Sequence, residues 1–125
     1  MAPDLIALLG RLAMSAIFLW SGVLKATAPA VTMAGFARLH VPAVSFVYAV
    51  SLFIEIAVAA ALAVGWKARP AALVLAVWCI ATAFVAHYHP HDRAQMINFM
   101  KNIAMAGGLL QVVAFGTGRL SLERR

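Results

Sequence analysis

The residues best suited to chemistry in this chain are charged and amide side chains set within strongly apolar segments. The clearest case is INFMKNIAMAGGLL (97–110), in which Lys101 is flanked by Asn98 and Asn102. Two other apolar segments contain Arg11 and Glu55. Groups of this kind can exchange protons, pair with one another or donate hydrogen bonds to a ligand, and they are costly to place in lipid. What they do therefore depends on whether these segments cross a membrane.

The composition is that of an integral membrane protein. Of 125 residues, 65% are hydrophobic and 11% are charged, and the mean hydropathy is +0.94. A soluble domain is usually about half apolar and about a quarter charged. With so few charges this chain could not cover its surface in water, so the sequence predicts membrane insertion and contact with the lipid bilayer.

Four apolar segments approach the roughly 20 residues that a helix needs to cross a bilayer. They run from Leu5 to Leu24, from Ala43 to Gly65, from about Pro70 to Tyr88 and from about Ile97 to Phe115. Turn-like residues separate them, and no linker or second domain is visible. The sequence thus predicts an all-α fold: residues 1–125 form a single domain, a bundle of four transmembrane helices.

The orientation of this bundle follows from the lysines and arginines of the loops. One side carries three of them, and the other side, with the chain ends, carries five: Lys25, Arg38 and Arg93 against Lys67, Arg69, Arg119, Arg124 and Arg125. This bias predicts that both termini are cytoplasmic. The formal charge of +6 is then membrane-flanking charge, because no basic stripe or interleaved exposed aromatics indicate nucleic acid.

The charges within the spans cannot be moved to the interface by shifting a boundary. Starting the first span after Arg11, or the last after Asn102, leaves a helix too short to cross, and Glu55 lies at the middle of its span. Each such charge costs about 2.5–3.5 kcal/mol if it faces lipid. We therefore expect the charges to converge inside the bundle, with Arg11 paired to Glu55 and with Lys101 and Asn98 beside Lys25 and His87. This predicts a polar pocket that opens outward and ends near Glu55.

Several of these residues also have a purely structural interpretation. Buried polar contacts can simply hold membrane helices together, and for Arg11 the sequence leaves structure and function equally open. Gly107 and Gly108 are expected to let helices approach closely. Cys79, the only cysteine, lies in an apolar run and is expected to pack without reacting.

Three histidines and an aspartate lie close together in the AHYHPHD segment: His87, His89, His91 and Asp92. A metal site is one alternative, because imidazole and carboxylate bind Zn, Cu or Ni. The spacing matches no established zinc signature and Pro90 interrupts it, so we expect a solvated loop and no metal. His87 differs because it ends the third span, where an imidazole can exchange protons near neutral pH.

Taken together, these segments resemble the DoxX family of small four-helix membrane proteins of bacteria. The resemblance lies in Arg11 with FLWSGVLKAT, Glu55, GWKARPAA, His87 and the C-terminal KNIAMAGGLLQVVAFGTGRLSLE, and it covers residues 5–123. Thr117 and Glu123 replace a proline and an aspartate that are usual in the family. The matching positions are Arg11, Gly22, Lys25, Glu55, Arg69, His87, Lys101, Asn102 and Arg119.

The resemblance implies a place in the bacterial inner membrane and an association with membrane redox complexes. We therefore expect a quinone-interacting or accessory subunit of an oxidoreductase complex, with quinone as the candidate cofactor and a soluble redox protein as partner. The chain has no self-contained catalytic motif. A non-catalytic anchor that recruits a soluble oxidoreductase is the alternative, and a small-solute transporter is a weaker one because no span is broken. So small a bundle has little interior, which is compatible with a homodimer.

Overall fold

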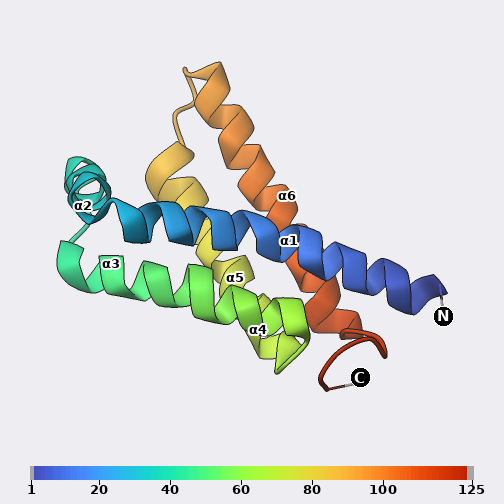
Figure 1. Cartoon of the computed structure of the whole chain (residues 1–125). Coiled ribbons are helices and arrows are strands. Elements are labelled where there is room, and N and C mark those ends of the chain that lie inside the picture. The colour runs from blue at the N-terminus through green and yellow to red at the C-terminus, as the bar shows by residue number, and fades with distance from the viewer. Residues whose placement is uncertain (1, 124–125) are drawn as a thin grey trace.

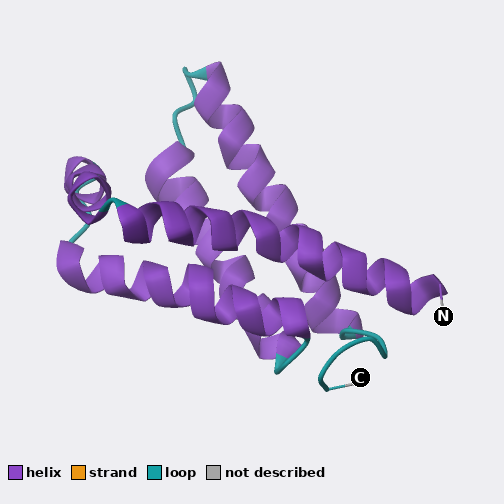
Figure 2. Cartoon of the chain, viewed as in Figure 1, coloured by secondary structure: helices purple, strands orange, loops and turns teal. Residues whose placement is uncertain are grey.

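The computed structural model describes residues 2–123 and consists of helices joined by short loops (Figures 1 and 2). Within this part of the chain, four helical rods are long and apolar enough to cross a membrane: Ala2–Thr27, Val44–Val64, Ala68–His87 and Arg93–Phe115. The predicted all-α, four-span architecture is confirmed. Large apolar side chains such as Ile6 and Phe46 are exposed to about 70% on the outside of the rods, as expected for a lipid-facing surface.

Residues 2–123 form eight helical elements. They are α1 (Ala2–Thr27), α2 (Pro29–Arg38), α3 (Val44–Leu52), η1 (Phe53–Val58), α4 (Ala59–Val64), α5 (Ala68–Thr82), η2 (Ala83–His87) and α6 (Arg93–Phe115). Seven of them make up the four rods, whereas α2 lies between the first two rods. The elements η1 and η2 are π-helical segments with a wider turn, and each continues an α-helix without a break. The second span is therefore α3–η1–α4, and the third is α5–η2.

The span boundaries differ from the sequence-based ones by up to four residues, and one further helix is present. The last span begins at Arg93, earlier than Ile97, because the side chain of Asp92 caps the helix by accepting a hydrogen bond from the Gln95 backbone N–H at 3.2 Å. Residues 29–38, expected as a loop, form the short helix α2, which starts with Pro29 in the first turn. Length alone could not reveal α2, since it is too short to cross a bilayer.

The packing follows a two-plus-two arrangement. α1 packs against the α3–η1–α4 rod, whereas α6 packs against α5 and η2, and α4 and η1 join the two pairs through α5. Figure 1 shows the α5–α6 pair crossing behind the α1 and α3–α4 pair. α5 is suited to this central place because its buried face is rich in alanine, which lets neighbouring helices approach closely.

The apolar core lies between α4, α5 and α6, where Leu62, Leu75 and Leu109 have no exposed surface. Phe18 of α1 packs against the same cluster. Polar side chains are buried at two other levels, around Arg11 and around Glu55. The core thus separates two polar regions, one at each side of it along the bundle.

Candidate functional site

The candidate site is a cavity of about 630 Å³ between the two helix pairs, toward the end of the bundle where α1 ends and α6 begins. Most of its wall is apolar, with Phe18, Trp78 and Met105 among the lining side chains. Six of the seven residues predicted to form a pocket line it: Lys25, Glu55, His87, Asn98, Lys101 and Asn102. They come from four separate elements, so the fold brings together groups that are distant in sequence.

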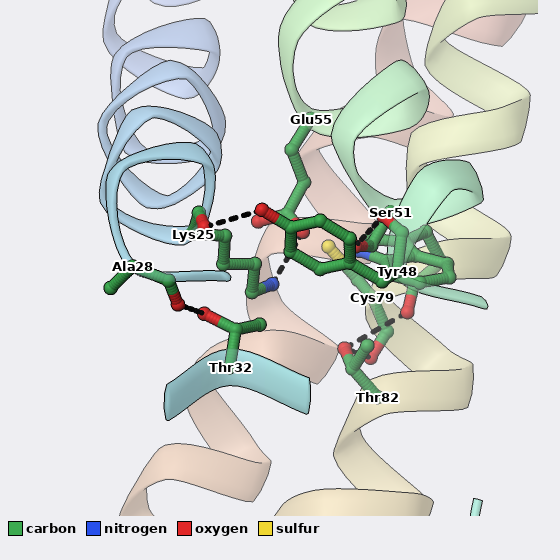
Figure 3. A network of polar contacts seen from close by, with 9 residues as sticks. Lys25, Ala28, Thr32, Tyr48, Ser51, Glu55, Cys79 and Thr82 are labelled. Atoms are coloured by element: carbon green, nitrogen blue, oxygen red, sulfur yellow. Dashed lines mark hydrogen bonds and ion pairs between the residues drawn. The ribbon is translucent and has the colours of Figure 1, made fainter. Parts of the chain in front are cut away.

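One wall of the cavity is formed by an ion pair between Lys25 of α1 and Glu55 of η1. Glu55 is only 2% exposed, whereas the Lys25 side chain keeps about a quarter of its surface accessible. Figure 3 shows the Lys25 side chain reaching from α1 toward the carboxylate of Glu55. A carboxylate buried to this degree needs a cationic or hydrogen-bonding partner, and Lys25 supplies it.

Neighbouring polar groups hold this pair in place. The hydroxyl of Tyr48 donates a hydrogen bond of 2.8 Å to the backbone carbonyl of Lys25, which ties α3 to the end of α1. The Ser51 hydroxyl donates to the Tyr48 carbonyl at 2.8 Å (Figure 3). Gly22 permits the close approach of α1, because an added Cβ there would lie 2.6 Å from Ile56 and 3.1 Å from the Cβ of Glu55.

The opposite wall is formed by η2 and α6. The Nδ1 of His87 lies 2.8 Å from the amide Oε1 of Gln95, which joins the end of the third span to the start of the fourth. Asn98, Lys101 and Asn102 follow along α6 at spacings that place them on one side of the helix. Within residues 2–123 no hydrogen bond or ion pair engages the ammonium of Lys101. This wall therefore presents hydrogen-bond donors to the cavity.

Both π-helical segments carry a residue of the cavity. Glu55 lies within η1 and is the buried residue of that segment, and His87 is the last residue of η2. Just before η2, the hydroxyl of Thr82 bonds back to the carbonyls of Trp78 and Cys79, a contact that bends helices. π-helical turns are frequent at functional sites because they reorient side chains within a helix. No feature of the apolar runs predicted these wider turns.

The predicted Arg11–Glu55 pair is wrong. Arg11 is 1% exposed and donates from its guanidinium to the carbonyls of Leu62 at 3.2 Å and Ala63 at 2.8 Å, and also to the carbonyl of Leu120. Leu62 and Ala63 lie in the last turn of α4, where carbonyls have no partner within the helix. A cation at the C-terminal end of a helix also interacts favourably with the helix dipole. Arg11 therefore belongs to a helix junction outside the cavity.

The C-terminal tail completes this junction. The backbone N–H groups of Leu122 and Glu123 donate to the carbonyls of Val64 and Gly65. Gly65 has a φ of +78°, and an added Cβ would lie 2.2 Å from the Cβ of Ser121, so only glycine suits this turn. The sequence offered two signals for this contact, the glycine before Trp66 and the buried arginine, but it did not show that they meet.

The remaining positions of the family pattern lie at the same end as the junction or on α6. Arg69 and Arg119 are exposed; Arg69 borders the tail, and the backbone N–H of Arg119 donates to Asp4 at 3.0 Å. An added Cβ at Gly108 would lie 3.1 Å from the sulfur of Met14, in line with the predicted close packing. An added Cβ at Gly107 would meet nothing within 4 Å, so the prediction that Gly107 lets helices of this chain approach closely is wrong. Arg124 and Arg125 lie outside the described residues.

The metal alternative at the third loop finds no support in the fold. Among the described residues, no three histidine, cysteine, aspartate or glutamate side chains are placed to hold a metal ion. His89 and His91 are exposed in the turn, whereas the imidazole of His87 forms a hydrogen bond with the side chain of Gln95. Of the three histidines, only His87 lines the cavity.

Comparison with known proteins agrees with the resemblance noted from the sequence. The family model that matches the chain is DoxX, and it matches residues 6–88. The chain belongs to the DoxX family. The matched range of this DoxX chain includes Lys25, Glu55 and His87, whereas Lys101 and Asn102 lie beyond it.

Two proteins of Escherichia coli (strain K12) are similar to this DoxX chain over nearly its whole length. Inner membrane protein YphA is 28% identical over 129 residues, covering 99% of this chain and 92% of the relative. Inner membrane protein YqjF is 29% identical over 121 residues, with 97% and 92% covered. No solved structure matches the chain significantly. Together with the four spans, these relatives identify a multi-pass protein of the bacterial inner membrane.

Proposed function

We propose that this DoxX protein binds the headgroup of a membrane quinone in the cavity and acts as the quinone-interacting subunit of a redox complex. The observation that carries the proposal is the cavity itself, which combines apolar walls with hydrogen-bond donors and one buried carboxylate inside the membrane-spanning part of the bundle. Its volume of about 630 Å³ falls within the range of about 300–1,000 Å³ that is typical of small-molecule sites. The lining groups suit a ring with two carbonyl oxygens and a hydrocarbon tail.

The charges of the lining residues favour an electron-rich ligand. Glu55 is neutralised by Lys25, which leaves Lys101 as a cation available to a ligand. An ammonium in a low-dielectric site donates strong hydrogen bonds to carbonyl oxygens. In this proposal Lys101 donates to one quinone oxygen, and the amide of Asn102 orients the ring.

In this proposal the carboxylate of Glu55 and the imidazole of His87 exchange protons with the ligand. Glu55 is the carboxylate of the cavity wall, and His87 lies at the end of the bundle, where protons can reach it from the membrane surface. A bound quinone supplies two-electron redox chemistry, and the residues of this chain bind it, orient it and exchange its protons. The only cysteine is Cys79, so the chain lacks the thiolates that hold an iron–sulfur cluster. In this proposal a soluble oxidoreductase partner supplies the electrons.

Extraction of the protein from its own membrane in a mild detergent tests the proposal. We expect mass spectrometry of the purified protein to find a quinone in near-stoichiometric amount. Asn102→Leu should lower the quinone content severalfold, because it removes one donor from the cavity and leaves the helix intact. Gln111→Leu is the matched control, since Gln111 is an exposed amide on the same helix outside the cavity. Absence of quinone from the wild-type protein, or equal retention in both variants, would refute the proposal.

The second candidate is a non-catalytic anchor that recruits a soluble oxidoreductase. It is favoured by the exposed basic side chains at the end where the tail meets the α4–α5 turn: Lys67, Arg69 and Arg119. The docked tail gives this surface a fixed shape that an acidic partner could recognise. The charge bias of the loops predicts that this end is cytoplasmic. Neutralising the three side chains should abolish co-purification of a partner while the quinone content stays unchanged; persistent co-purification would exclude this surface.

A further inference from the structure

A second hollow lies on the outer face of α6, separate from the main body of the cavity. It is a groove of about 650 Å³, lined by Pro90, His91, Arg93, Met96, Ile97, Met100, Lys101 and Ala104. Lys101 lines both the groove and the cavity, whereas Arg93 lines the groove but not the cavity. Arg93, Ile97 and Lys101 follow at steps of four residues and form one stripe of the helix surface.

We propose that this groove, referred to below as the α6 groove, binds an anionic phospholipid, with the phosphate held between Arg93 and Lys101. Its cationic side chains are Arg93 and Lys101, with His91 beside them, and no acidic residue lines it. The nearby Asp92 is engaged as the cap of α6 through the backbone N–H of Gln95. The charge of the α6 groove is therefore complementary to a lipid headgroup that carries a net negative charge.

The geometry of α6 agrees with a headgroup bound at this depth. Arg93 and Lys101 are eight residues apart, which corresponds to about 12 Å along a helix. Side chains on a helix tilt toward its N-terminus, so the Lys101 side chain is directed back toward Arg93 and the membrane surface. The long Lys101 side chain can therefore reach a phosphate that lies at the level of Arg93.

The apolar residues of the α6 groove lie on both sides of Lys101 along the helix: Met96, Ile97 and Met100 precede it, and Ala104 follows it. Met100 is 57% exposed, and Ala104 is exposed one turn further along the helix. A phosphate held near Arg93 therefore has exposed apolar side chains beneath it, which an acyl chain extending into the membrane can contact. An acidic protein segment would satisfy the cations but not the exposed apolar stripe that continues into the span.

The energetic argument is that Lys101 needs an anion. Within residues 2–123 its ammonium has no protein partner, although it belongs to a membrane-spanning helix. A cation in such a place is costly unless it is paired or reaches the interface. A lipid phosphate at the level of Arg93 pairs it without burying a further protein charge. The ammonium of Lys101 has three N–H donors, so a phosphate on the outside of the bundle leaves a donor for a ligand in the cavity. Arg93 lines the α6 groove and not the cavity, so its replacement tests this inference separately from the quinone proposal.

Native mass spectrometry of the full chain tests the inference. The protein is reconstituted in nanodiscs that contain equal amounts of phosphatidylglycerol and phosphatidylcholine with identical acyl chains. We expect a retained phosphatidylglycerol on the wild-type protein. Arg93→Gln should weaken its retention about fivefold, and adding Lys101→Gln should weaken it about twenty-five-fold, since each cation near the surface contributes comparably.

Two control variants separate the α6 groove from other causes. Arg38→Gln removes an exposed cation from α2 at the same end of the bundle and should leave lipid retention unchanged. Asn102→Leu, which alters the cavity but not the α6 groove, should also leave it unchanged. Equal retention of both lipids, or equal losses in Arg38→Gln and Arg93→Gln, would overturn the inference. A dimer that forms in place of lipid binding and disappears in Arg93→Gln would assign the α6 groove to a second copy and would overturn it as well.

Discussion

Replacing Arg11 by methionine should destabilise the bundle without emptying the cavity. The guanidinium donates to three backbone carbonyls that connect α1, α4 and the C-terminal tail. Hydrogen bonds from a charged donor contribute about 1.5–3 kcal/mol each, but the cost of burying the charge offsets part of their sum. Removing the guanidinium leaves buried backbone acceptors without this donor, which costs about 1–3 kcal/mol per unsatisfied group, and we expect a loss of at least this size for Arg11→Met.

The assay for Arg11→Met combines unfolding in detergent with amide hydrogen exchange. The denaturation midpoint should fall, and the amides of Leu122 and Glu123, bonded to Val64 and Gly65, should lose their protection. Arg38→Met is the control, because Arg38 is an exposed arginine of α2. Unchanged stability and unchanged protection of the tail would refute the assignment of Arg11 to the junction. Loss of ligand at unchanged stability would return Arg11 to the site.

Three further changes test the local geometry, all by the shift of the unfolding midpoint in detergent. Lys25→Met should cost about 3 kcal/mol because it strands the buried Glu55, and adding Glu55→Gln should restore part of this; strictly additive losses would show that the two side chains are not coupled. Gly65→Ala should cost at least about 1 kcal/mol, since alanine is strained at its positive φ. Gly22→Ala should cost about 1–3 kcal/mol by overpacking against η1. Gly10→Ala should be neutral or stabilising, because an added Cβ there meets nothing within 4 Å. Equal effects of Gly22→Ala and Gly10→Ala would contradict the close approach at Gly22.

The architecture could be predicted from the sequence because one physical quantity dominates it. A span needs about 20 apolar residues, and the chain offers four runs close to that length. The convergence of Lys25, Asn98 and Lys101 followed from the same reasoning, since polar groups in a span avoid lipid. Depth along each helix was sufficient to place them near one another, even without knowledge of the crossing angles.

The partner of each charge could not be predicted in this way. The depth of each residue along its helix was compatible with an ion pair between Glu55 and Arg11. In the structure Glu55 pairs instead with Lys25, which lies at the end of α1 that is next to the start of α3. Arg11 instead donates hydrogen bonds to backbone carbonyls. Every residue has such a carbonyl, so the amino-acid sequence does not indicate which ones Arg11 binds. The π-helical turns of η1 and η2, which direct Glu55 and His87, are likewise invisible in a pattern of apolar residues.

The most direct test of the central claim, that the cavity binds a quinone headgroup, uses the fluorescence of Trp78 in its wall. Replacing the exposed Trp20 and Trp66 by phenylalanine leaves Trp78 as the only tryptophan. Titration with a short-chain quinone should then quench the emission saturably. Lys101→Met should weaken the apparent affinity at least about tenfold, as expected for the loss of a charged hydrogen bond, while Lys67→Met at the other end of the bundle should not change it. Quenching that never saturates, or that is the same in all three proteins, would contradict the account.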